Sequence, residues 1–142
     1  MIESIGDLVN VLEQNYNNMS IYNFNHFVSL YNGTDWKEYI QEIGLDFYKV
    51  KIYLSKNFEI ILIIWKEGYS TPLHAHPENG CIIKVLEGNL VEEIINNKQK
   101  QINNYIPGNV SYMHNSKGLH KIFSIKNSYS LHIYSPPGFY DN

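Results

Sequence analysis

Residues 68–88 read GYSTPLHAHPENGCIIKVLEG, and this stretch decides how the chain is interpreted. His74 and His76 are separated by one residue. On an extended segment alternate side chains point to one face, so both imidazoles can reach a single ion. Cys81 then opens an apolar run that stops at Glu87-Gly88. The stretch therefore predicts a metal-binding segment that leads into a β-strand and a turn.

From residue 47 onward, short apolar runs alternate with turn residues such as Glu-Gly-Asn and Pro-Gly-Asn. Regular short strands with no helices between them are typical of an antiparallel barrel or sandwich. The predicted strands are 47–54, 58–65, 81–87, 90–95, 99–106, 110–113, 120–126 and 129–135. We expect a tight hairpin at Asn96-Asn97, between the fourth and fifth of these strands.

The first 45 residues have a different pattern and predict helices. Apolar residues recur at helical spacing after Ser4, which can serve as the N-cap of a first helix. A second helix is predicted for 23–31. A third begins at Thr34 or Asp35, either of which can cap it, and runs to about Gly44.

The length of 142 residues suits one domain, in which residues 1–45 pack on a β-barrel formed by residues 46–142. The net charge of −3 gives no reason to expect nucleic acid or an anionic membrane as a partner. The longest apolar run, 60–65, is far too short to span a bilayer. The acidic start of the chain lacks the features of a signal peptide, and a single cysteine excludes an internal disulfide. We expect a cytoplasmic monomer.

The frame around the two histidines resembles the first motif of the cupin superfamily, G-x5-H-x-H-x(3,4)-E-x6-G. Gly68, His74, His76 and Gly88 all fall on the spacing of this motif. Cys81 takes the position of the motif glutamate. The resemblance implies a mainly β fold, a cupin barrel of the double-stranded β-helix or jelly-roll type with N-terminal α-helices.

A second, looser cupin motif supplies a third histidine. Residues 107–109, Pro-Gly-Asn, open a strand, and His120 follows Gly118-Leu119 about 44 residues after His76. In a closed barrel this strand can lie beside the H-x-H segment. Three histidines without a protein carboxylate leave an octahedral ion with about three open positions.

A cupin with cysteine in place of the motif glutamate resembles the cysteine dioxygenases. Three segments are similar to segments of that family. Residues 88–93, GNLVEE, are similar to its G-N-L-x-E, and residues 112–120, YMHNSKGLH, to its Y-I-N-D-S-x-G-L-H. Residues 130–137, SLHIYSPP, match its S-L-H-L-Y-S-P-P almost residue for residue. With Trp36-x-x-Tyr39 and the strand that reaches Trp65, the resemblance covers most of the chain.

The resemblance implies one Fe²⁺ per chain, held by His74, His76 and His120. Three neutral imidazoles leave the ion at +2, so the thiolate and amine of a substrate and dioxygen can take the open positions. Both oxygen atoms would then reach sulfur and form a sulfinic acid.

The resemblance also implies roles for residues near the metal. Cys81 and Tyr134 would lie next to it and can join as a thioether cross-link. His132, with Ser130 beside it on the same face of a strand, would orient the Tyr134 hydroxyl, which would donate a hydrogen bond at the reaction site.

The family binds the substrate carboxylate with an arginine, and this chain has no arginine. The predicted strand 47–53 offers Lys49 and Lys51, which lie on one face, and the hydroxyl of Tyr48. A lysine supplies a point charge but lacks the bidentate fork of arginine. The sequence leaves these three candidates open.

The sequence thus predicts an enzyme, an iron-dependent thiol dioxygenase that oxidises L-cysteine with O₂ to cysteine sulfinic acid. The nearest alternative is the same chemistry on another small thiol, such as 3-mercaptopropionate. A second is a non-catalytic cupin that binds a metal or a small ligand. A cupin isomerase or epimerase is disfavoured, because those enzymes usually keep the motif glutamate.

Overall fold

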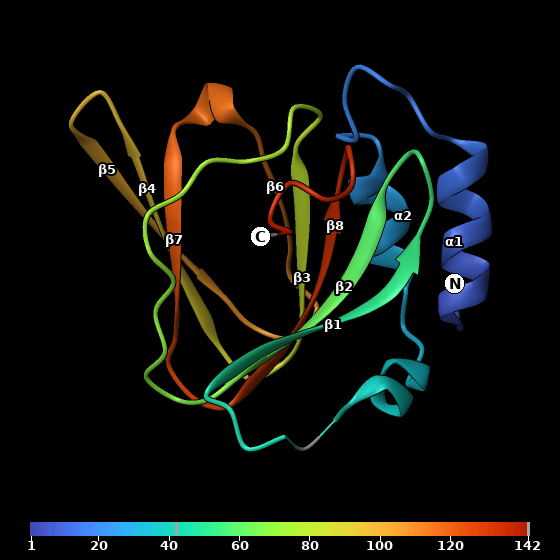
Figure 1. The fold of residues 1–142 in the computed structure, drawn as a ribbon, viewed down its shortest axis with the longest axis horizontal. Helices are drawn as coiled ribbons and strands as arrows, with labels where there is room; N and C mark the ends of the chain where they lie inside the picture. Colours follow the sequence, from blue (N-terminus) through green and yellow to red (C-terminus); the bar gives the residue numbers. More distant parts are fainter. Residues whose placement is uncertain (42, 142) are drawn as a thin grey trace.

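Eight strands form two sheets in residues 1–41 and 43–141, the part of the chain that this computed structural model describes (Figure 1). The larger sheet has the order β1-β2-β8-β3-β6, and the smaller has the order β5-β4-β7. The strands are β1 Phe47–Leu54, β2 Glu59–Trp65, β3 Cys81–Glu87, β4 Leu90–Asn96, β5 Gln99–Tyr105, β6 Val110–Met113, β7 Leu119–Ser124 and β8 Ser128–Tyr134. The paired strands are antiparallel. The predicted mainly β architecture is confirmed.

The helices α1 (Ile5–Gln14) and α2 (Phe24–Leu30) lie on the outer side of the larger sheet (Figure 1). The first begins as predicted, because the Ser4 side chain accepts a hydrogen bond from the backbone N–H of Asp7 at 3.0 Å. The N-terminal helices are therefore present. Among the described residues, no helix combines the length and the apolar character needed to cross a membrane.

The third predicted helix is wrong. η1 (Asp35–Tyr39) is a short 3-10 turn, and the chain is extended again at Ile40; residue 42, within the predicted span, lies outside the described residues. The Asp35 carboxylate does not cap this turn. It accepts hydrogen bonds from the backbone N–H of Ile5 at 2.8 Å and from the Tyr31 hydroxyl at 2.6 Å. It therefore ties η1 to the start of α1 and to the residue that follows α2.

The hairpin between β4 and β5 turns one residue later than predicted. Asn97 and Lys98 have φ values of 50° and 67°, so they are its central pair. Asn96 belongs to the strand and pairs with Gln99. A two-residue turn with positive φ at both positions suits asparagine, and two adjacent asparagines make its position ambiguous from composition alone.

The larger sheet is buried on both faces. On β2, Ile60 and Leu62 join the core under the helices, whereas Ile61 and Ile63 join a second core between the two sheets. The residues of β8 alternate in the same way. Strands buried on both faces read as continuous apolar runs, which is why the sequence of β2 shows no alternation.

Lys84 joins the helical layer to the sheet from the middle of β3. Its side chain is buried, and its Nζ donates to the backbone carbonyl of Val28 at 2.9 Å and to that of Tyr31. These carbonyls belong to the C-terminal end of α2, where a cation is favourable. The lysine therefore fixes the end of α2 against β3.

Candidate metal centre

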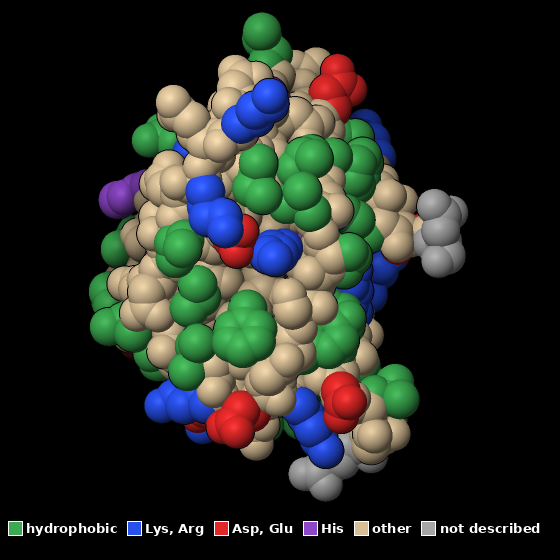
Figure 2. Space-filling model, turned by 90° about the vertical axis from the view of Figure 1, so that its left-hand side faces the viewer, with side chains coloured by type: hydrophobic (Ala, Val, Ile, Leu, Met, Phe, Trp, Pro, Cys, Tyr) green, Lys and Arg blue, Asp and Glu red, His purple; other side chains and the backbone are tan. Residues whose placement is uncertain are grey.

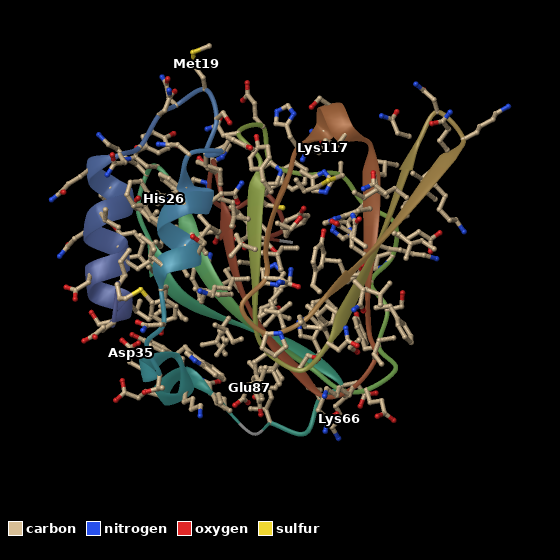
Figure 3. All side chains as sticks on the ribbon, turned by 180° about the vertical axis from the view of Figure 1, so that it is seen from behind. Met19, His26, Asp35, Lys66, Glu87 and Lys117 are labelled. Atoms are coloured by element: carbon tan, nitrogen blue, oxygen red, sulfur yellow. The ribbon has the colours of Figure 1, made fainter. Side chains whose placement is uncertain are left out.

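Three histidine side chains meet between the two sheets. His74 and His76 come from the segment before β3, and His120 lies on β7. One ring nitrogen from each residue lies within 4.8 Å of the other two. The backbones of His74 and His120 exchange two hydrogen bonds, at 2.9 and 3.1 Å, which fixes the two strands of chain together. His26, labelled in Figure 3, lies on α2 and outside this cluster.

The other ring nitrogen of the first two histidines is tied to an acceptor. The Nδ1 of His74 is 2.8 Å from the carbonyl oxygen of Pro72. The Nδ1 of His76 is 3.2 Å from the Oδ1 of Asn115, which also accepts the backbone N–H of His76 at 2.8 Å. Because these oxygens can only accept, both rings carry their hydrogen on Nδ1. Their Nε2 atoms therefore have free lone pairs.

A buried carboxylate holds the third ring. The Nδ1 of His120 is 2.6 Å from the Oε2 of Glu92. Glu92 also accepts from the Tyr105 hydroxyl at 2.6 Å and from the Nδ2 of Asn103 at 3.3 Å. Burial raises the pKa of Glu92, but the hydrogen bonds from these three residues together bring it below its ordinary value. The carboxylate accepts the Nδ1 hydrogen of His120, so in the neutral ring the lone pair is on Nε2.

The three Nε2 atoms form a set of metal donors. The Nε2 of His120 lies 2.9 Å from the Nε2 of His74, so when both rings are neutral with their hydrogen on Nδ1, two lone pairs face each other. The Nε2 of His76 is buried, with no hydrogen-bond partner among the described residues. Burial lowers the pKa of His74, and lowers that of His76 to about 3, so both rings are neutral ligands. A cation would relieve the repulsion and satisfy the orphaned atom, and neutral imidazoles suit iron, zinc, copper or nickel.

A hydrogen-bond relay runs along β8 on the opposite wall. The Trp65 Nε1–H can only donate, and it donates to the Ser130 Oγ at 2.8 Å. Ser130 in turn donates its hydrogen to the Nε2 of His132 at 2.6 Å. Burial keeps the pKa of His132 well below its ordinary value, so the neutral ring carries its hydrogen on Nδ1. That hydrogen goes to the Tyr134 hydroxyl at 3.1 Å, which leaves the phenolic hydrogen free to point into the cavity.

Cys81 and Tyr134 face each other across neighbouring strands. They are register partners in the antiparallel pair of β3 and β8, and both side chains are buried. Side chains directly opposite in such a pair are within contact range. Burial raises the pKa of the Cys81 thiol, so the sulfur is protonated at neutral pH.

One cavity of about 190 Å³ joins the histidines to the relay. Its walls include the aliphatic side chains Ile63, Ile83 and Ile122 and the aromatic side chains Phe47, Trp65 and Tyr69. His74, His120, Cys81, His132 and Tyr134 also line it. The volume suits a molecule of a few heavy atoms, and the apolar walls exclude water from its surroundings.

The three candidates for a carboxylate partner lie in different places. Lys49 lines the mouth of the cavity, with its Nζ 5.0 Å from the centroid of the Tyr140 ring. Lys51 lies on the same face of β1 but pairs with Glu59 at 3.0 Å and with Asp141 at 3.1 Å. Tyr48 points away from the cavity, and lines a separate surface depression.

The C-terminal segment closes one side of the cavity through Tyr140. Its hydroxyl donates to the carbonyl oxygen of Ala75 at 2.6 Å, between the two histidines of the H-x-H segment. Its ring contacts those of Tyr134 and His74, with centroids at 4.9 and 5.6 Å. Glu59 holds the same segment, because its Oε2 accepts the backbone N–H of Gly138 at 2.7 Å.

The family model described as "Cysteine dioxygenase type I" matches residues 3–141. The chain belongs to the cysteine dioxygenase type I family. It is 31% identical over 91 residues to cysteine dioxygenase type 1 of Rattus norvegicus, an alignment that covers 56% of this chain and 46% of that protein. It is 23% identical over 155 residues to the Danio rerio protein of the same name, covering 95% and 76%. The chain thus spans about half the length of the mammalian relatives it matches.

Solved structures support the barrel fold of this cysteine dioxygenase family member. A cupin superfamily protein from Desulfitobacterium hafniense aligns with a TM-score of 0.60 at 15% identity, over 73% of this chain and 90% of the other. A single-residue variant of oxalate decarboxylase from Bacillus subtilis aligns with a TM-score of 0.61 at 19% identity, over 75% and 29%. At these identities the likeness extends to the fold alone, and it confirms the predicted cupin barrel.

Four residues of the site in this cysteine dioxygenase family member had no role in the prediction from sequence, namely Trp65, Glu92, Asn115 and Tyr140. Glu92 and Asn115 fall inside segments that resemble the family, so a signal for them existed. Leu90, Glu92 and Ile94 are all buried on one face of β4, which their alternation could have shown. Tyr140 had no such signal, since it reaches the site through Ala75, far away in the sequence.

Proposed function

We propose that this protein is an iron-dependent thiol dioxygenase that converts L-cysteine and dioxygen into cysteine sulfinic acid. The observation that supports it best is the convergence of one ring nitrogen from each of three histidines beside a cavity that the buried Tyr134 also lines. Metal ligands lie on one wall and a hydrogen-bond donor on the other. The reaction adds both atoms of dioxygen to the thiol sulfur, so atoms balance without a further reductant.

One Fe²⁺ per chain is the proposed cofactor, with His74, His76 and His120 as its ligands. When bound, the ion supplies a Lewis acid with open positions for a thiolate, an amine and dioxygen. Among the described residues, the cluster that could hold the ion contains no carboxylate, so a substrate thiolate would meet no competing protein anion there.

Tyr134 is the proposed catalytic residue. Its hydroxyl accepts from His132, so its own hydrogen is available to stabilise negative charge on the oxygen atoms of the forming sulfinate. Ser130 and His132 are positioning residues, because they set the direction in which the phenol donates.

A thioether between Cys81 and Tyr134 is a further proposal for this site. A bond between the cysteine sulfur and a ring carbon of the tyrosine removes the thiol hydrogen and one ring hydrogen, and dioxygen takes both, with their two electrons, to give hydrogen peroxide. The register of β3 and β8, which sets the two residues opposite each other, supports the proposal. Mass spectrometry after turnover should find a chain lighter by two hydrogens, and Cys81→Ser should not produce it. A chain of unchanged mass with a free thiol after prolonged turnover would contradict it.

Lys49 is the proposed partner of the substrate carboxylate. It lines the cavity mouth, whereas Lys51 is occupied by two carboxylates and Tyr48 faces another depression. A cation at this point compensates the desolvation of a carboxylate that enters the cavity. Because a lysine fixes one charge but no bidentate geometry, another small carboxylated thiol such as 3-mercaptopropionate is the second candidate substrate.

The test is oxygen consumption by the iron-loaded protein with L-cysteine, 3-mercaptopropionate and cysteamine, with the product identified by mass spectrometry. We expect the largest kcat/KM for L-cysteine and a product heavier than the thiol by two oxygen atoms. The largest value for 3-mercaptopropionate would transfer the assignment to that thiol. Iron binding without oxygen consumption on any of the three would leave a non-catalytic metal-binding protein and refute the enzyme.

A further inference from the structure

The wall of the candidate metal centre contains a carboxylate that contacts one of the three histidines but supplies no ligand atom to the cluster. Cys81 occupies the position of the cupin-motif glutamate, yet Glu92 lies behind His120 with its Oε2 2.6 Å from the Nδ1. The side chains of Glu92 and His120 are only 1% and 2% exposed. The carboxylate is therefore one imidazole ring away from the proposed ion.

The Nδ1 hydrogens of the three proposed ligands go to acceptors of different charge. His74 donates to a backbone carbonyl and His76 to the amide oxygen of Asn115, both neutral. His120 alone donates to a carboxylate. A carboxylate behind a metal-bound imidazole orients the ring and makes its other nitrogen more basic. The Nε2 of His120 should thus bind a metal more strongly than the Nε2 atoms of the other two histidines.

The surroundings of Glu92 also call for a positive charge beyond His120. Its other polar contacts, from the Tyr105 hydroxyl and the Asn103 side chain, are neutral donors. Among the described residues it makes no ion pair with a lysine. A buried carboxylate is costly without a compensating charge, and a divalent ion on the far side of the imidazole supplies one.

We propose that Glu92 is a positioning residue that passes negative charge to the metal through His120. The inference rests on the proposed function, because it assumes that His120 binds the ion. It gives the site the charge of a carboxylate while leaving every open position to substrate and dioxygen. It also accounts for a cupin site that functions without the motif glutamate.

Glu93 offers a matched control one residue along the same strand. Its side chain is partly exposed and pairs with Lys100 at 2.9 Å and Lys121 at 3.8 Å. Figure 2 views the molecule from the side of the smaller sheet, where basic and acidic side chains lie close together on the surface. Glu93→Gln and Glu92→Gln remove the same charge from adjacent positions. Only the second touches His120. In Glu92→Gln the amide oxygen of the new side chain can still accept the Nδ1 hydrogen, so this variant isolates the charge from the hydrogen bond.

The first measurement is the affinity of the metal-free protein for Co²⁺, titrated by visible absorption. We expect Glu92→Gln to raise the Kd about 10- to 100-fold, and Glu93→Gln to leave it unchanged. Glu92→Asp, which keeps the charge, should recover part of the loss. Equal losses in the Gln and Asp variants would mean that shape and not charge matters, and would overturn the proposal.

The second measurement is the Fe³⁺/Fe²⁺ midpoint potential of the iron-loaded protein. Negative charge stabilises Fe³⁺ more than Fe²⁺, so Glu92→Gln should raise the potential and Glu93→Gln should not. A lost structural contact alone gives no reason for a change of this sign. An unchanged potential in Glu92→Gln would also overturn the proposal.

Two further variants keep the outcomes separable. If Glu92→Gln does not fold, Tyr105→Phe removes one donor to the same carboxylate and should change the Co²⁺ Kd a few-fold; an unchanged Kd would refute the inference. His120→Ala tests the assumption underneath. If the native protein binds no metal, or His120→Ala binds it as well as the native protein, the proposed function fails. If metal binding needs His120 but ignores Glu92, only the inference fails.

Discussion

The two walls of the cavity use histidine in opposite ways. One wall carries His74, His76 and His120, and we call it the metal wall. There His120 gives its Nδ1 hydrogen outward to Glu92, so a lone pair of the neutral ring faces the cavity. On the β8 wall, His132 receives a hydrogen from Ser130 on Nε2, so its own hydrogen faces inward to Tyr134. The same imidazole presents a lone pair or a hydrogen to the cavity according to the partner on its far side.

The largest expected effect comes from removing the metal wall. His120→Ala should abolish stoichiometric iron binding, because only two of the three imidazole ligands remain. The fold should survive, since the core between the sheets is mainly apolar. Iron per chain, measured by atomic absorption, checks this prediction. His114→Ala is the control, because His114 is half-buried, lies outside the three-histidine cluster and bonds to Ser116 and the backbone of Glu78. Full iron occupancy in His120→Ala would remove this residue from the ligand set.

Breaking the β8 wall should lower turnover but not metal binding. Tyr134→Phe removes the hydroxyl at the end of the relay, and we expect kcat to fall about 100- to 10,000-fold. Iron content should match that of the native protein. Tyr129→Phe is the control on the same strand, since Tyr129 packs against Trp36 on the helical side. A Tyr134→Phe variant with native kcat would show that the relay has no part in the chemistry.

Acid should destabilise the metal-free protein through the buried histidines of both walls, and the part due to His132 can be isolated by substitution. Burial holds its folded-state pKa well below the ordinary value of 6.5, so the unfolded chain binds the proton first as pH falls. The contribution to stability is complete above pH 6.5 and is lost below it. Between pH 8 and pH 5 the free energy of unfolding should fall because of this group, by at most about 2 kcal/mol, the limit set by an unfolded-state pKa of about 6.5. Urea unfolding of metal-free protein measures it. His132→Gln, which cannot take up the proton, should show a shallower fall, and an identical slope would contradict the assignment.

The smallest expected effect concerns the mouth of the cavity, where Lys49 is the proposed partner of the substrate carboxylate. Lys49→Met should lower kcat/KM for L-cysteine by about 10-fold, the lower end for a hydrogen bond to a charged group, because Lys49 is partly exposed. Cysteamine, which lacks the carboxylate, should be unaffected. In Lys51→Met any loss should be equal for the two thiols, because Lys51 holds Glu59 and Asp141. Equal losses for both thiols in Lys49→Met would mean that the carboxylate is bound elsewhere.

Local signals in the sequence predicted which histidines converge, but not which lysine lines the mouth of the cavity. His74 and His76 lie two residues apart on one segment, so their convergence depends on local geometry that the sequence displays. Lys49 and Lys51 also share a face, and local geometry cannot separate them. What separates them is Asp141, about 90 residues further along, which pairs with Lys51 near the rim.

Competition between hydrogen-bond partners also explains the error in the predicted third helix. Asp35 looks like a helix cap in isolation, but its carboxylate is taken by Ile5 and Tyr31. Likewise, the partner of Ser130 is Trp65, which sequence spacing alone does not connect to it. The strands and the three-histidine cluster could be predicted from the sequence pattern. Hydrogen-bond partners that lie far apart in the sequence could be identified only from the folded structure.

The alternation along β8 has a consequence for how the protein can change over generations. His132 and Tyr134 line the cavity and Ser130 hydrogen-bonds to His132, whereas Leu131 and Ile133 between them belong to the core under the helices. Selection on catalysis and selection on thermal tolerance thus act on alternate positions of one short strand. Drift among Leu, Ile and Val at the two apolar positions should alter the melting point while the residues that face the cavity stay the same, so variants adapted to hot or cold habitats can keep one cavity lining.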